Sequence, residues 1–205
     1  TRTRVGQTGD FATSVSVGAT YGRLLALRIH QVWEAHGNPR VFPVLEPGPE
    51  DGSLALDILR AAREQDPAFH QALHYTACEP GTRKREALAN RFAATGEPNL
   101  RVVAAPAEAK AEWGIVLANE VLDALPVHLV RWSGSSWQEM FVGLESEKLA
   151  WTIAPCSDSP LSLHLAKLPT DLPEGYTTEV CLELFPFLKE LAATFEDTLL
   201  LLIDY

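Results

Sequence analysis

The order of apolar and polar segments in the first 120 residues is the feature that most constrains the fold. Short apolar runs, each followed by a loop of helix breakers or charged residues, alternate with amphipathic helical segments. This alternation is typical of parallel sheets, in which a helix connects each strand to the next. The expected strands are 41–45, 73–78, 100–103 and 113–118, and the expected helices are 21–34, 54–64 and 82–92. The sequence therefore predicts an α/β fold.

The second half of the chain has a different pattern. Three β-prone runs at 127–132, 137–143 and 149–153 are separated by Ser/Gly or charged turns, which predicts an antiparallel β meander inserted into the α/β order. We expect a helix over 179–195, bent at Pro186, and then a fully buried strand at 198–203. A length of 205 residues favours a single domain.

The charge of the chain narrows the possible partners. A formal net charge of −10, from 17 basic and 27 acidic residues, disfavours nucleic acid, whose binding depends on cationic side chains. A basic partner fits this charge better, although solubility alone also explains it. The longest apolar run, 199–203, is far shorter than the roughly 20 residues of a membrane span.

Cysteine and histidine spacing argues against a structural metal or a disulfide framework. Cys78, Cys156 and Cys181 are odd in number, far apart and without a C-x-x-C pair. This usage indicates a reducing compartment, and we expect a cytoplasmic location. His70 and His74 have the i, i+4 spacing of helical metal ligands, but no H-E-x-x-H motif surrounds them, so no metal site is expected.

Polar residues follow the expected strands at the points where a parallel sheet binds ligands. The exits carry the loop 46–52, then Glu79, then Asn119 and Glu120. The two glycines of the loop, Gly48 and Gly52, allow a backbone to approach a nucleotide, and Glu79 can accept hydrogen bonds from ribose hydroxyls. A tight turn and a solvated glutamate explain the same residues without a ligand.

The charge of the first loop distinguishes between nucleotides. Glu46, Glu50 and Asp51 lie in it without a lysine or arginine, so a pyrophosphate or triphosphate would be repelled, and no P-loop lysine is present. S-adenosylmethionine (SAM) carries a sulfonium and an ammonium but no phosphate, so it suits acidic surroundings. An NAD-dependent oxidoreductase remains an alternative only if this loop points away from the ligand.

Several motifs together resemble one known family. The most specific is Ala118-Asn119-Glu120-Val121-Leu122-Asp123-Ala124-Leu125-Pro126-Val127-His128, and the loops Gly9-Asp10-Phe11-Ala12-Thr13-Ser14 and Glu46-x-Gly48-Pro49-x-x-Gly52-x-Leu54 accompany it. These resemble the MidA family of class I SAM-dependent methyltransferases, which includes the mitochondrial complex I assembly factor that acts as a protein arginine methyltransferase. The resemblance implies a Rossmann-like sheet with the meander inserted. It also implies one methyltransferase-like domain over 1–205, truncated at both ends relative to the family.

The resemblance further implies which residues form the site. The cofactor would be SAM, held by Gly9, Asp10, Thr13, Glu46, Gly48, Gly52, Glu79 and Asn119. The catalytic group would be Asn119, Glu120, Asp123 and His128, with no metal. Glu120 and Asp123 suit a bidentate clamp on a guanidinium. His128 would relay a proton, or else be a strand residue with no chemical role.

Two departures from the family pattern leave an alternative open. Glu50 stands where the family has a middle glycine, and Val15-Ser16 stands where it has Pro-Glu. The leading interpretation is a methyltransferase acting on a protein, at an arginine nitrogen. The alternative is a binding or assembly protein that keeps the fold without the catalysis, and the bulk of Glu50 favours it. The sequence does not predict the oligomeric state.

Overall fold

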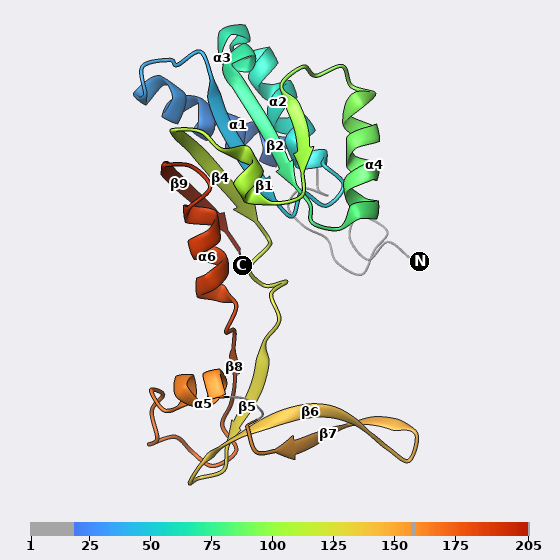
Figure 1. Ribbon diagram of the computed structural model, residues 1–205, viewed down its shortest axis with the longest axis vertical. Helices are drawn as coiled ribbons and strands as arrows, with labels where there is room; N and C mark the ends of the chain where they lie inside the picture. Colours follow the sequence, from blue (N-terminus) through green and yellow to red (C-terminus); the bar gives the residue numbers. More distant parts are fainter. Residues whose placement is uncertain (1–18, 157–158, 205) are drawn as a thin grey trace. The chain divides into compact units, whose positions relative to one another are not determined.

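The computed structural model describes residues 19–156 and 159–204 (Figure 1). The chain divides into two compact units, one formed by Thr1–Asp123 with Lys189–Tyr205 and the other by Ala124–Leu188. The expected meander falls in the second unit. That the two units form one domain, shortened relative to the family, stays a prediction.

The first unit contains a five-stranded parallel sheet with the order β3-β2-β1-β4-β9. Its strands are β1 (Phe42–Pro47), β2 (Leu73–Cys78), β3 (Leu100–Val103), β4 (Trp113–Asn119) and β9 (Asp197–Ile203). β1 pairs in parallel with β2 on one side and with β4 on the other. The chain therefore reverses its direction of winding at β1, which makes the carboxyl end of β1 the place where such sheets bind ligands. The predicted α/β class is confirmed.

Helices bury one face of this sheet. The helical segments of the unit's first part are α1 (Thr20–Ala35), α2 (Ser53–Gln65), α3 (Pro67–Ala72), α4 (Thr82–Ala93) and the 3-10 turn η2 (Pro106–Ala109). Phe42 of β1 and Tyr75 of β2 form one core with Ile29, Ile58 and Phe69 of the helices. Each such side chain stabilises the fold by about 1.5–3 kcal/mol relative to an exposed position.

Helix α3 was not expected, because the preceding helix was predicted to end before Pro67. Asp66 explains its presence. The Asp66 carboxylate accepts hydrogen bonds from the backbone N–H groups of Ala68 and Phe69 at 2.8 and 3.3 Å. Pro67 occupies the first helical position, where its missing N–H is not needed. The proline therefore starts a helix here.

The second unit is a four-stranded antiparallel sheet with the order β7-β6-β5-β8. Its elements are β5 (His128–Trp132), β6 (Trp137–Glu145), β7 (Lys148–Ala154), α5 (Ser159–Leu165) and β8 (Thr177–Val180). Leu161 and Leu165 of α5 form a small core with Val130 and Val180. The predicted antiparallel meander over 127–153 is confirmed.

The expected helix over 179–195 is wrong in its first part. The β-branched residues of β8 pair with β5, and helix α6 (Leu184–Ala192) begins only after them. Pro186 lies in the first turn of α6, where backbone N–H groups have no intrahelical partner, so it does not bend the helix.

The expectation of a fully buried last strand is also wrong. β9 pairs with β4 at the edge of the described sheet, and Leu199 and Leu202 are exposed. The apolar run predicts the strand, but it does not predict which of its faces is covered.

Candidate functional site

The exits of the parallel strands meet at one edge of the first unit. The N–H of Gly48, after β1, donates to the carbonyl of Cys78 at the end of β2 at 3.1 Å. The N–H of Glu120, after β4, donates to the carbonyl of Ile203 at the end of β9 at 2.8 Å. The structure therefore brings together the loop 46–52, Glu79 and the start of the Asn119–Glu120 segment, as the parallel sheet predicted.

Glu46, the first acid of the loop, lies in the core. Its side chain is buried, and the Tyr75 hydroxyl donates a hydrogen bond to its Oε2 at 2.9 Å. Burial raises the pKa of Glu46 to about 7, although the Tyr75 hydrogen bond opposes the shift. Glu46 therefore supports the start of the loop from within the core. Its contact with a cofactor stays a prediction.

The glycines of the loop are required by the chain itself. Gly48 and Gly52 have φ angles of +65° and +79°, in the left-handed region. A Cβ on Gly52 would lie 2.5 Å from Cε1 of Phe92, and a Cβ on Gly48 would lie 3.2 Å from Val121. The close packing of α4 beneath the loop therefore accounts for Gly52 without a ligand.

Glu50 also adopts the left-handed region, with a φ of 47°, at the position where the family has glycine. Its side chain is exposed. The backbone of the loop thus keeps a glycine-like turn despite the substitution. The bulk of Glu50 extends toward solvent and not into the core below.

The charge of the loop is smaller than the sequence suggests. Arg91 of α4 reaches back to the loop, and its Nη1 lies 2.7 Å from Oδ2 of Asp51. Partial burial raises the pKa of Asp51, but hydrogen bonds from Arg91 and Ser53 outweigh this effect and leave that pKa below its usual value. Arg91 lies outside the loop, so the sequence of the loop alone does not reveal this ion pair. Among the ion pairs of the described residues none involves Glu50.

Glu79 is turned back into the connection between β2 and α4. It is buried, and its Oε1 accepts a hydrogen bond from the N–H of Gly81 at 2.6 Å. Arg85 donates to the carbonyl of Glu79 at 3.0 Å and so holds the same turn. The second carboxylate oxygen, Oε2, is the atom with which Glu79 would meet a ribose hydroxyl. The ribose role itself stays a prediction.

Asn119, the last residue of β4, is oriented by a residue of α1 that no sequence motif indicated. Tyr21 of α1 donates its hydroxyl hydrogen to Oδ1 of Asn119. Because this bond occupies the amide oxygen, the amide NH₂ group is directed elsewhere and keeps its donors. Asn119 therefore offers hydrogen-bond donors at the carboxyl edge of the sheet.

Three carboxylates converge next to Asn119. Each of Glu120, Asp123 and Asp204 has an oxygen within 4.8 Å of one on the others. Asp204 follows β9, and its Oδ2 accepts hydrogen bonds from the N–H groups of Leu122 and Asp123 at 3.1 and 3.2 Å. Asp204 thus fixes the segment that carries the two predicted residues. The sequence marked it only as the end of a strand, because the pairing of β4 with β9 is not visible in it.

The environment of Glu120 favours a cationic neighbour. Desolvation raises its pKa, and the negative charges of Asp204 and Asp123 raise it further. Its Oε1 is buried, and no hydrogen-bond partner lies among the described residues. A cation with N–H groups would satisfy this oxygen and relieve the repulsion between the carboxylates.

The remaining predicted residues belong to the second unit or lie outside the described residues. His128 belongs to the second unit, where its Nδ1 lies 2.6 Å from Oε1 of the buried Glu139. Its role as a proton relay stays a prediction. Gly9, Asp10 and Thr13 lie outside the described residues.

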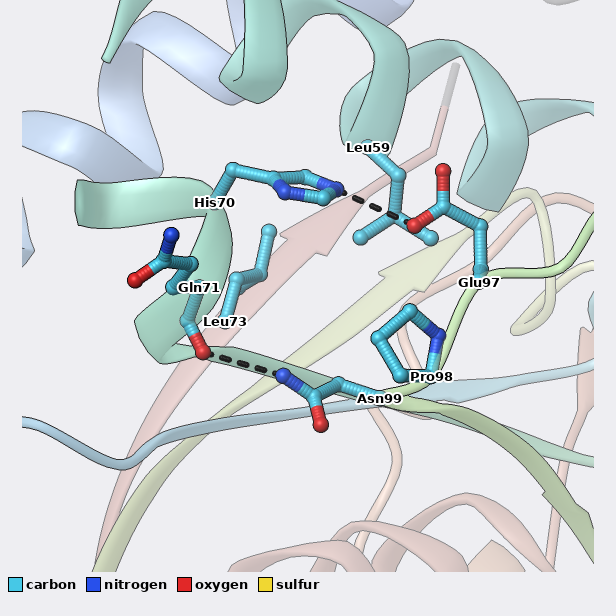
Figure 2. Close-up of a pocket in the computed structure, with 7 residues that line it drawn as sticks. All are labelled: Leu59, His70, Gln71, Leu73, Glu97, Pro98 and Asn99. Atoms are coloured by element: carbon cyan, nitrogen blue, oxygen red, sulfur yellow. Dashed lines mark hydrogen bonds and ion pairs between the residues drawn. The ribbon is translucent and has the colours of Figure 1, made fainter. Parts of the chain in front are cut away.

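A hollow of about 100 Å³ at the opposite, amino-terminal edge of the sheet is structural in character (Figure 2). Nε2 of His70 lies 3.1 Å from Oε2 of Glu97, which also pairs with Arg63. Nδ2 of Asn99 donates to the carbonyl of Gln71 at 2.9 Å. His70 and Asn99 are therefore held by polar contacts within the fold.

Comparison with known proteins identifies the family. A family described as "Putative S-adenosyl-L-methionine-dependent methyltransferase" matches residues 24–205. The chain belongs to this family. The family inferred from the Asn119–His128 motif is therefore confirmed.

Similar proteins extend this result. The mitochondrial protein arginine methyltransferase NDUFAF7 homolog of Drosophila melanogaster is 28% identical over 87% of the chain and 44% of its own length. The Bos taurus NDUFAF7 is 28% identical over 76% of the chain and 41% of its own length. A solved structure from Burkholderia thailandensis, bound to S-adenosyl-homocysteine, has a TM-score of 0.70 and 27% identity over 94% of the chain and 49% of its own length. The chain thus spans less than half the length of these relatives.

The expected cytoplasmic location is contradicted by the curated relatives, which are mitochondrial proteins. The cysteine pattern indicates only a reducing compartment, and the cytoplasm is not the only one. Among the helices of residues 19–156 and 159–204, none has both the length and the apolar character that crossing a bilayer requires.

Proposed function

We propose that this chain binds SAM at the carboxyl edge of its parallel sheet and takes part in methyl transfer to an arginine nitrogen of a protein substrate. One observation carries the proposal. A glycine-like turn after β1, Glu79 after β2 and Asn119 at the end of β4 meet at the point where the strand order reverses. The family of the chain is that of SAM-dependent methyltransferases. The names of the mitochondrial relatives support a protein arginine substrate.

The residues at this edge fit the cofactor. Oε2 of Glu79 would accept from the ribose, and the amide donors of Asn119, oriented by Tyr21, would hold an acceptor group of the ligand. The exposed charge of Glu50 suits a ligand with an ammonium and a sulfonium and no phosphate. SAM, when bound, supplies an electrophilic methyl group. The predicted contacts of Gly9, Asp10 and Thr13 with it belong to the same proposal.

The carboxylates beside Asn119 would hold the acceptor. A guanidinium has N–H groups in a planar fork that matches a carboxylate, and Glu120 has a buried oxygen without a partner among the described residues. Asp204 would keep Glu120 and Asp123 in place through the backbone amides that it accepts. Because its pKa is raised, Glu120 is a stronger base than a free glutamate, and we assign it the proton that the methylated nitrogen loses.

A second function remains, supported by Glu50. A chain with the family fold and a glutamate at the middle glycine position would serve as a binding or assembly protein without methyl transfer. The exposed position of Glu50 weakens the steric reason for this alternative, because the side chain is directed to solvent.

Calorimetric titration of the full chain with SAM separates the two functions. We expect binding, and about a tenfold or greater loss of affinity in Glu79→Gln, since a hydrogen bond to a charged group contributes about 1.5–3 kcal/mol. Glutamine keeps the acceptor for Gly81, so the turn is retained. Glu86→Gln, an exposed acid on α4, is the matched control and should bind like the parent.

Two results would count against the proposal. Absence of binding at millimolar SAM would refute it and leave the assembly function. Equal affinity in Glu79→Gln would exclude Glu79 from the ribose site. Transfer of a labelled methyl group to an arginine-rich peptide, with a lysine-rich peptide of equal charge as control, tests the acceptor.

A further inference from the structure

The hairpin formed by β6 and β7 extends beyond the rest of its sheet. β5 pairs with β6 only as far as the Leu129–Met140 pair, whereas β6 and β7 remain paired as far as Glu145 and Lys148. Figure 1 shows this ribbon continuing past β5. A two-stranded ribbon is at most marginally stable in water by itself, so its side chains need a further surface to pack on.

One face of the ribbon is apolar along its whole length. Residues directly opposite each other in an antiparallel pair lie on the same face. The pairs Met140–Ile153, Val142–Trp151 and Leu144–Leu149 therefore form one continuous apolar stripe. No charged residue lies within these pairs.

The stripe is open to solvent. Five of its six side chains are exposed, from Ile153 at 40% to Leu149 at 78%, with Val142, Leu144 and Trp151 between these limits. Met140 is half-buried. Scattered exposed apolar residues are ordinary, but a contiguous patch is not.

The helix of the second unit does not cover the stripe. Leu161 and Leu165 of α5 pack on Val130 and Val180. Val130 pairs with Glu139, which alternates with Met140 along β6 and so lies on the other face of the sheet. The described part of the second unit thus covers one face and leaves the stripe on the opposite face.

We infer that this stripe is the surface through which two copies of the chain associate face to face about a twofold axis. The exposed apolar area is on the order of 600 Å², the upper end of what the largest patch on a typical monomer shows. Complete burial of two such patches would remove about 1,200 Å² from water, which is the lower end of the range of specific interfaces. An uncharged stripe packs best on another uncharged surface. The same stripe on a second copy of the chain is such a surface and has the same length. Trp151 at its centre is the residue type that most often anchors such contacts.

Sedimentation velocity and light scattering on the full chain, from low to high micromolar concentration, test this inference. We expect twice the chain mass for the parent protein. Trp151→Glu and Leu149→Glu should each reduce the mass to that of one chain, because a buried charge without a partner opposes association. Thr152→Glu is the matched control: it adds the same charge to the neighbouring exposed residue on the opposite face and should leave the mass doubled.

Circular dichroism establishes that each variant is folded. Should Trp151→Glu unfold, Leu144→Ser near the end of the ribbon replaces it as the test. A parent protein that stays a single chain over the whole range overturns the inference, as do folded stripe variants that keep the doubled mass. The test is independent of SAM, so its outcome does not depend on the proposed function.

Discussion

Replacing Gly52 with alanine tests whether the loop after β1 is shaped by packing. Gly52 has a φ of +79°, and an added Cβ would lie 2.5 and 2.6 Å from two ring atoms of Phe92 and 3.0 Å from Leu88. Phe92 and Leu88 are both buried, so neither can move into solvent. The substitution therefore combines a strained backbone with a steric overlap.

The two costs can be separated by size. A left-handed backbone costs an alanine about 1–2 kcal/mol, partly offset by about 0.4–1 kcal/mol because alanine restricts the unfolded chain. Overpacking against the ring costs a further 1–3 kcal/mol or so. We expect Gly52→Ala to lower the free energy of unfolding by about 2–4 kcal/mol.

Gly96→Ala is the matched control. Gly96 has a φ of +70°, and a Cβ there would meet no atom within 4 Å. Gly96→Ala therefore has only the cost of the left-handed backbone and should lower the free energy of unfolding by about 1 kcal/mol. Urea unfolding followed by circular dichroism measures both variants. Equal losses would refute the reasoning, because the contact with Phe92 would then contribute nothing.

Three further predictions follow. Burial raises the pKa of Glu46 from 4.5 to about 7, so the folded state binds the proton more tightly, and stability should fall as pH rises between these values and level off above them. In thermal unfolding measured against pH, Glu46→Gln should flatten this slope, and an unchanged slope would contradict the prediction. Tyr21→Phe removes the hydrogen bond to Asn119, so it should lower the free energy of unfolding in urea by about 1 kcal/mol and weaken SAM binding in calorimetry. Unchanged affinity would show that Asn119 does not contact the cofactor. Asp204→Asn removes a charge beside Glu120, so the pKa of Glu120 measured by NMR should fall, and a constant pKa would show that the carboxylates do not interact.

The sequence determined the strands of the first unit and the family of the chain. The strands expected at 73–78 and 100–103 are β2 and β3 to the residue, because the apolar periodicity and the flanking breakers are local signals. The motif around Asn119 identified the family because it is a contiguous run of side chains. The positions of Glu79 and Asn119 at one edge followed from the parallel order of the strands.

Only the tertiary structure decided how the candidate site is held together. Arg91 reaches Asp51 across 40 residues, and Tyr21 reaches Asn119 across 98. The burial of Glu46 and the anchoring of a loop by Asp204 depend likewise on which strands lie side by side. Charge neutralisation, desolvation and hydrogen bonding act through space, and a linear pattern carries no distance between segments that the fold brings into contact.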